Sequence, residues 1–159
     1  MLMPACGAPV PSADAGPEAA VPPDCRPVPM EMLAHRSSAS DVSRRSDNWI
    51  AGGPGTIDEA LVRAAIRRKR EALRECYDRQ RACNPHLNGV LGLRLRIDVT
   101  GAVRVETEAD DPALAATGVT ACAIERLESL SFAATPPSGG EASFAFPLTF
   151  LPPARRTER

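Results

Sequence analysis

The sequence has no apolar run that approaches the roughly 18 residues of a membrane-spanning helix, so we expect no such helix in it. It has no excess of either charge: the formal net charge is −1 at pH 7, which gives no general attraction to nucleic acid or to an anionic membrane. Lysine is almost absent, because Lys69 is the only lysine among the 19 basic residues. Any basic surface of this protein is therefore built from arginine.

The residue patterns of common catalytic sites are also missing. The sequence has no Ser-His-Asp order, no glycine-rich phosphate loop and no paired carboxylates on opposed predicted strands. It has only two histidines, His35 and His86, and both lie in segments that we predict to be weakly structured. We therefore expect a protein that is not an enzyme and that needs no cofactor.

The N-terminal third of the chain is poor in the residues that build a core. Half of the 16 prolines lie before residue 30, mixed with alanine, glycine, serine and aspartate. Such a segment cannot bury enough apolar surface to offset its ordering entropy. We predict a disordered leader and linker over 1–54, a folded domain over 55–152 and a tail over 153–159. Trp49 and Ile50 are the only substantial apolar pair of the linker, and they either dock onto the domain or merely precede it.

The stretch "LMPACG" resembles the end of a bacterial lipoprotein signal, in which Cys6 would be lipidated and become the first residue of the mature protein. A charged region and an apolar region normally precede that cysteine, and neither is found here. Two interpretations stay open. Either the resemblance is due to chance, or Met1 lies inside a longer signal peptide. A proline-rich tether after Cys6 would suit the second interpretation.

Residues 56–80 have the apolar period of a helix. Thr56 and Glu59 resemble a capping box at its start. The arginines fall mostly on the remaining faces, with glutamates spaced for ion pairs within the helix. A solvated face is a better interpretation than a nucleic-acid patch, because no aromatic or glycine pattern accompanies these arginines. The apolar stripe is Val62, Ala65, Ile66, Ala72, Leu73, Cys76 and Tyr77, and the arginines are Arg63, Arg67, Arg70 and Arg74.

Residues 90–99 change to a period of two, which predicts a strand with one buried and one wet face. Thr100 and Gly101 form a turn, after which Val103 and Val105 continue the apolar face on a second strand. The residues predicted to point to the core from the first strand are Leu91, Leu93, Leu95, Ile97 and Val99.

A second helix begins near Asp111, with Pro112 at its first position, and carries Cys122 on its apolar stripe. The stretch "ASFAFPLTF" then alternates as a third strand. Pro147 lies within this strand and cannot donate a hydrogen bond to a neighbour, which favours an edge position.

This order of elements predicts an α+β fold. A right-handed helical crossover from the second strand places the third strand beside the first. We therefore expect two helices on one face of a three-stranded antiparallel sheet with strand order 2-1-3.

The cysteines have several alternatives. Cys76 and Cys122 lie on the buried stripes of two neighbouring helices, so we favour a disulfide between them over two buried thiols. Such a bond would stabilise the fold by about 4 kcal/mol in the chain-entropy model. Cys25 and Cys83 have no evident partner. We expect no metal, because a zinc site needs four ligands, normally in close-set pairs.

Several stretches together resemble one known family. They read "AAIRRKREALRECYDRQ", "NPHLNGVLGLRLRIDVTGAV", "GVTACAIERLESLSF" and "SGGEASFAFPLTF". Their shared elements are a Cys-Tyr pair ending the first helix, Asn-Pro-x-Leu-x-Gly, Ile-Asp-x-x-Gly-x-Val, the cysteine of the second helix and a final Phe-Pro-x-x-Phe strand. Over about residues 56–151, the chain resembles the C-terminal domain of the AgmX/PglI family, which is related to the C-terminal domain of the energy transducer TonB.

The resemblance implies a bacterial envelope protein exposed to the periplasm, with Cys76 and Cys122 at the paired-cysteine positions of the family. It also implies an interaction module that binds an envelope protein or peptide by strand addition. The expected receiving edge is Ser143, Phe144, Ala145, Phe146, Pro147, Leu148, Thr149 and Phe150. We expect no nucleic-acid partner, and membrane contact only through a lipid at Cys6.

Three alternatives to this function stay open. The last strand is an edge that Pro147 merely blunts, as in many sheets. Cys83, beside Arg81 and near His86, is the one candidate for a reactive thiol in a redox protein. The arginine-rich first helix is the candidate surface of a small domain that binds nucleic acid or another anion.

Overall fold

The computed structural model describes residues 22–34 and 49–152 of the chain. Cys6 and the predicted tail over 153–159 lie outside the described residues. The described elements, in chain order, are α1 (Met30–Ala34), β1 (Ile50–Gly52), α3 (Glu59–Arg68), α4 (Arg70–Arg81), β2 (Gly89–Ile97), β3 (Val103–Ala109), α5 (Pro112–Thr117), α6 (Val119–Glu128) and β4 (Ala142–Phe150).

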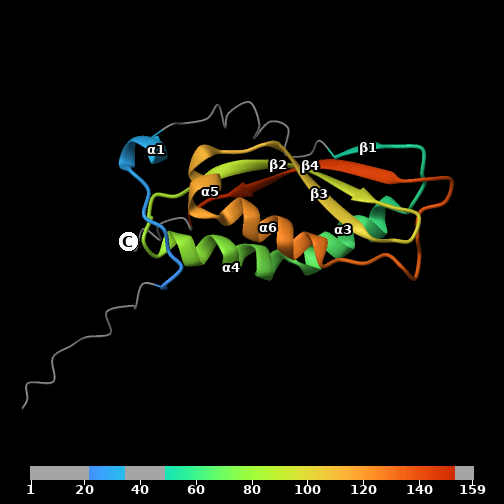
Figure 1. Cartoon of the computed structure of the whole chain (residues 1–159), viewed down its shortest axis with the longest axis horizontal. Helices are drawn as coiled ribbons and strands as arrows, with labels where there is room; N and C mark the ends of the chain where they lie inside the picture. Colours follow the sequence, from blue (N-terminus) through green and yellow to red (C-terminus); the bar gives the residue numbers. More distant parts are fainter. Residues whose placement is uncertain (1–21, 35–48, 153–159) are drawn as a thin grey trace, which may run out of the picture.

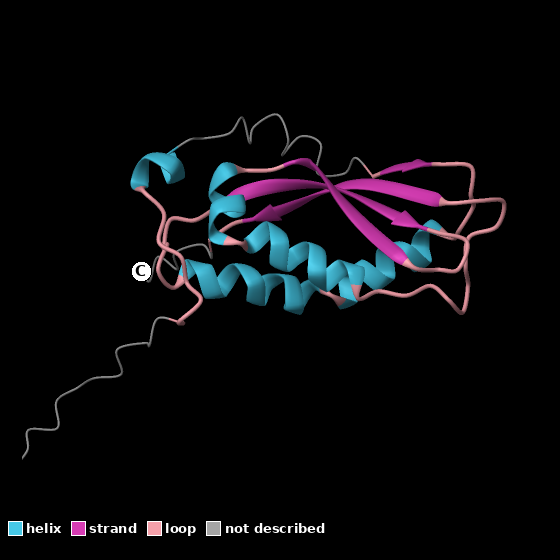
Figure 2. Ribbon diagram, viewed as in Figure 1, coloured by secondary structure: helices cyan, strands magenta, loops and turns pink. Residues whose placement is uncertain are grey.

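These elements form two layers (Figure 1). One layer is an antiparallel sheet in the order β1-β4-β2-β3, and α3, α4 and α6 lie together against one of its faces. Figure 2 shows the same separation, with the magenta strands above the long cyan helices α4 and α6. The prediction of an α+β fold with an antiparallel sheet is therefore confirmed.

The predicted number of strands is wrong, because the sheet has four strands within the described residues. The three strands expected from the sequence are β2, β3 and β4, and β2 lies between the other two. The additional strand is β1, which pairs with β4. All three residues of β1 are exposed, so it has no alternation of apolar and polar side chains that would predict a strand.

The predicted number of helices is also wrong within the described residues, because both long helices are interrupted and α1 is an additional short helix. The first is divided into α3 and α4 at Lys69, whose N–H donates to the carbonyl of Ile66 in a tighter turn. The second is divided into α5 and α6 at Gly118, which has φ +83°. This left-handed conformation ends a helix readily only when the residue has no Cβ.

The prediction of a disordered leader over 1–54 does not hold for 22–34 and 49–54, which are part of the described structure. Met32, Leu33 and Trp49 pack against the main core. Composition misled here because it measures only how much apolar surface a segment can bury. It does not register that the fold brings the few apolar side chains of the segment onto the core, or that the rest of the chain bonds to the segment's backbone.

The core lies between the sheet and the helices. Leu91, Leu93, Leu95 and Ile97 of β2 are all completely buried, as the period of two predicts. Val99, which the sequence placed on the same face, is 60% exposed, because β2 ends at Ile97 and the chain then turns.

The opposite face of the sheet carries ion pairs instead of a second layer. Arg94 pairs with Glu108, and Arg96 pairs with both Glu106 and Glu141. This face is therefore a solvated surface.

None of the helices that the structure describes has the length and apolar character needed to cross a membrane.

Candidate functional site

The receiving edge expected over 143–150 is only half free. Strand β4 pairs with β2 along its whole length, and on its other side β1 covers Ser143, Phe144 and Ala145. Ser143 and Ala145 are consequently 6% and 5% exposed, so they are not the open, small-residue surface that the sequence predicted. The last five residues of β4 have no strand on that side within the described part of the chain. We call this stretch, 146–150, the free stretch of β4.

A groove separates the free stretch of β4 from α3 and α4. It consists of two connected hollows of about 450 and 390 Å³, which share Ile66, Arg67, Arg70 and Leu148 in their walls. The first hollow is lined also by Leu73, Arg74, Tyr77, Thr149, Phe150 and Leu151. The second is lined also by Trp49, Arg63, Phe146 and Pro147. The groove therefore follows the edge to which a further strand could pair.

The floor of the groove is apolar and well packed. The rings of Tyr77 and Phe150 are stacked with their centres 5.4 Å apart. The Tyr77 hydroxyl donates to the carbonyl of Leu87 at 2.5 Å. Burial is the main cause that raises the pKa of Tyr77 above its ordinary value of 10.0, so the phenol stays neutral. The floor thus offers a rigid apolar surface and no negative charge.

Trp49 forms the end of the groove next to β1. Its ring stacks on Phe146 at 5.0 Å and lies 5.3 Å from Phe144, so the linker docks onto the domain here. The guanidinium of Arg63 lies 4.5 Å from the centre of the Trp49 ring, a cation–π contact, and Arg63 also pairs with Glu59. One face of this tryptophan is therefore already covered by a cation.

Four arginines of α3 and α4 form the rim of the groove: Arg63, Arg67, Arg70 and Arg74. Arg74 has a long ion pair with Asp78, at 3.8 Å. The side chains of Arg67 and Arg70 have no ion pair or hydrogen bond to any described residue, and no described carboxylate lines the groove. The sequence assigned these arginines to a solvated face. All four are exposed, as that prediction requires, and the structure in addition makes the arginine row and the last strand two walls of one groove.

Two disulfides cross-link the described residues of the domain. Cys76 of α4 is bonded to Cys122 of α6, which is the pair favoured from the sequence. Cys25 is bonded to Cys83, and neither was expected to have a partner. Because Cys83 is in a disulfide, it is not the free thiol that the redox alternative requires. This pair was missed because Cys25 lies in the segment whose composition predicted disorder.

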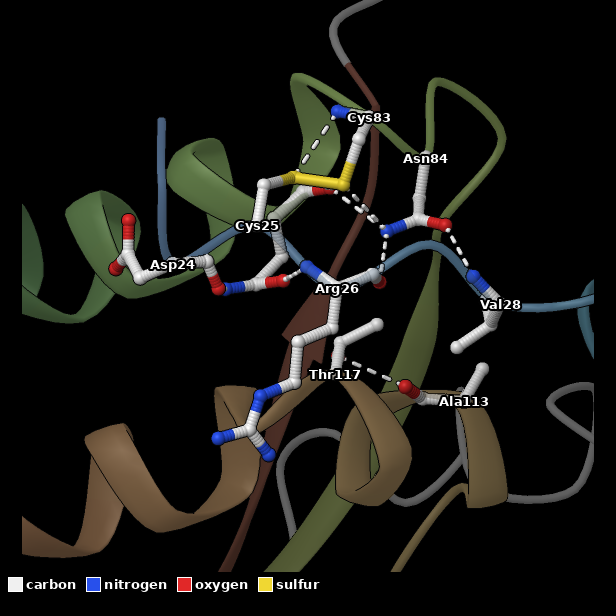
Figure 3. The surroundings of a disulfide bond; sticks show 9 residues. Asp24, Cys25, Arg26, Val28, Cys83, Asn84, Ala113 and Thr117 are labelled. Carbon is white, nitrogen blue, oxygen red and sulfur yellow. Dashed lines mark hydrogen bonds between the residues drawn. A yellow bond between two sulfur atoms is a disulfide. The ribbon is translucent and has the colours of Figure 1, made fainter. Parts of the chain in front are cut away.

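The segment over 22–28, which we call the strap, is held beside the end of α4 by two side-chain amides (Figure 3). The amide of Gln80 accepts from the Arg26 N–H at 2.8 Å and donates to the Asp24 carbonyl at 2.9 Å. The amide of Asn84 donates to the Arg26 carbonyl at 2.8 Å and accepts from the Val28 N–H at 2.9 Å. Successive backbone groups of the strap are therefore paired much as they would be in a sheet.

The described residues contain no group of three or more histidine, cysteine, aspartate or glutamate side chains that could hold a metal ion. Comparisons of the chain with protein-family models, with curated proteins and with solved structures give no match. The resemblance to the AgmX/PglI and TonB domains stays a prediction, and the groove is the best-defined candidate site of the described residues.

Proposed function

We propose that this domain is a non-enzymatic module of the bacterial cell envelope, exposed to the periplasm, that binds an extended segment of a protein partner. The partner adds as a strand to the free stretch of β4. The single observation that carries this proposal is the half-occupied edge: β1 pairs antiparallel with Ser143, Phe144 and Ala145 and stops where the groove begins. An edge that already accepts one short strand has the geometry to accept its continuation.

The chemistry of the two sheet edges favours β4 over β3. Strand β3 carries charged residues, which commonly protect an edge, and the Val105 N–H is bonded to the carboxylate of Glu128 at 3.1 Å. The free stretch of β4 contains no charged residue. Pro147 lacks an N–H, so the added strand is bound through few main-chain hydrogen bonds and the affinity is modest.

The two disulfides support the assignment to an oxidising compartment, since cytosolic thiols are normally kept reduced. A lipid at Cys6 would hold such a module at a membrane surface. Among the alternatives, an anion-binding domain is favoured by one specific observation: the side chains of Arg67 and Arg70 have no partner among the residues that the structure describes.

The test is amide chemical-shift mapping during titration with a neutral extended peptide in which glutamine alternates with threonine. The proposal expects the largest shifts over 146–150 and at the neighbouring β1. Shifts concentrated at β3, or on the outer sheet face around Arg94 and Arg96, would overturn it. An absence of any shift at β4, with every peptide used, would overturn it as well.

A further inference from the structure

The arginine rim is a row of like charges along one side of the groove. Arg63 and Arg67 are four residues apart, Arg67 and Arg70 three, and Arg70 and Arg74 four. The first and the last pair each lie on one helix, where these spacings bring side chains together, and like charges so placed repel one another. Arg67 and Arg70 lie on either side of the break at Lys69, and both line both hollows of the groove. The two arginines in the middle of the row have no described partner that offsets this repulsion. Such an arrangement is stabilised when an anionic ligand occupies the groove.

The row runs alongside the free stretch of β4 in the same direction. Arg63 lies in the hollow that contains Phe146, whereas Arg74 lies in the hollow that contains Phe150. Residues three to four apart on a helix advance by about 4.5–6 Å along its axis. Alternate residues of a strand advance by about 6.6 Å. A strand added to β4 would therefore place successive inward side chains near successive arginines.

We infer that the partner segment is acidic, with carboxylate side chains at alternate positions on the face that meets α3 and α4. This inference rests on the proposed strand addition and specifies its ligand. Arginine suits the role because its guanidinium presents a planar fork of donors that fits a carboxylate. Acidic side chains on the partner would approach Arg67 and Arg70, while their methylene groups would lie on the apolar floor at Ile66 and Leu148.

An acidic peptide fits the groove better than a nucleic acid does. Recognition of single strands normally relies on aromatic rings that stack with bases. The one tryptophan of this groove is packed on Phe146 and covered by Arg63. The remaining rings, those of Tyr77 and Phe150, are buried. The site therefore offers cationic groups and a strand edge, and little free ring surface.

The experiment compares three short peptides of the same length, in which threonine alternates with glutamate, with glutamine or with lysine. Each is titrated into the full chain at low salt, and affinity and amide shifts are measured together. We expect the glutamate peptide to bind about ten-fold more tightly than the glutamine peptide, because several partly exposed charge contacts contribute. The preference should shrink as salt is raised, and the lysine peptide should bind most weakly.

The matched variants change the same number of charges. Arg67→Gln with Arg70→Gln should abolish the preference for glutamate over glutamine while leaving the shifts over 146–150 in place. The control is Arg68→Gln with Arg104→Gln, two exposed arginines that do not line the groove, and it should retain the preference. Glutamine is a good helix former, so the changes in α3 and α4 leave the fold intact.

The outcomes separate the inference from the proposed function. Equal binding of the glutamate and glutamine peptides, with shifts over 146–150, overturns the acidic preference and leaves strand addition standing. A glutamate preference that survives the Arg67 and Arg70 changes also overturns the inference. Shifts confined to α3 and α4, without any at β4, overturn strand addition itself. Tighter binding of a single-stranded oligonucleotide than of the glutamate peptide overturns the acidic-peptide inference.

Discussion

Asn84 holds the backbone of Val28: its Oδ1 accepts from the Val28 N–H at 2.9 Å, although 56 residues separate the two. The Asn84 side chain is only 2% exposed, and its Nδ2 also donates to the carbonyls of Arg26 and Gln80. Removing a buried amide whose oxygen and nitrogen are both paired costs more than the net free energy of its hydrogen bonds. The reason is that its former partners are then left unpaired and still desolvated. The strap is therefore an integral part of the domain.

Asn84→Ala should destabilise the protein by about 1–3 kcal/mol, because it leaves strap backbone groups without partners. The amides of Arg26 and Val28 should lose hydrogen-exchange protection before the core does. The matched control is Asn88→Ala, an exposed asparagine whose loss should cost less than about 0.5 kcal/mol. Equal effects of the two changes would contradict the role assigned to Asn84.

Both disulfides should be present in protein exported to an oxidising compartment, and peptide mapping without reduction should find Cys76 linked to Cys122 and Cys25 linked to Cys83. Alkylation of any of the four before reduction would argue against that bond. Replacing Cys76 and Cys122 by alanine should lower Tm strongly, because this bond joins two core helices. By closing a long loop, the bond contributes about 4 kcal/mol to the free energy of unfolding.

Replacing Cys25 by serine should act locally. The strap would lose its covalent attachment to the end of α4, so exchange protection should fall at Arg26 and Val28, while the amides of β2 stay protected. From the sequence alone this change would be expected to do nothing. Unchanged protection of the strap would show that the amides of Gln80 and Asn84 hold it without the disulfide.

Leu95→Ala should cost about 2–5 kcal/mol, because Leu95 is completely buried in β2 and the change leaves a cavity. Arg94, the preceding residue, faces the solvated side and pairs with Glu108. Arg94→Ala should therefore cost no more than about 1 kcal/mol. Urea denaturation of the two variants measures the difference, and equal costs would refute the assignment of the two faces.

Asp98 should give the stability of the turn after β2 a dependence on pH. Hydrogen bonds from the Thr100 hydroxyl, which is the largest cause, and from the Thr100 and Ala102 N–H groups lower the pKa of Asp98 below its ordinary value of 3.8. A lowered folded pKa means that the contribution is complete above 3.8 and is lost as pH falls through the folded pKa. The stability difference between wild type and Asp98→Ala should therefore shrink in acid. Thr100→Ala should reduce the same pH dependence, and a difference that grows in acid would contradict this assignment.

The sequence by itself determined those features that depend on the burial of side chains within one element. The alternation from Leu91 to Ile97 predicts β2 because a strand with one buried face must alternate. The apolar stripes of the two helical regions, which include Cys76 and Cys122, likewise follow from the period of a helix that buries one face. These patterns are local, so they can be read without knowing the neighbours.

Only the tertiary structure decided the features that are held through backbone groups. Strand β1 buries none of its own residues and exists because β4 offers it hydrogen-bonding partners. The strap is fixed by Gln80, Asn84 and Cys83, which lie more than fifty residues away along the chain. The groove likewise exists only where the row of arginines meets the part of β4 that β1 leaves uncovered. No local period records such contacts, because they depend on which segments the fold brings together.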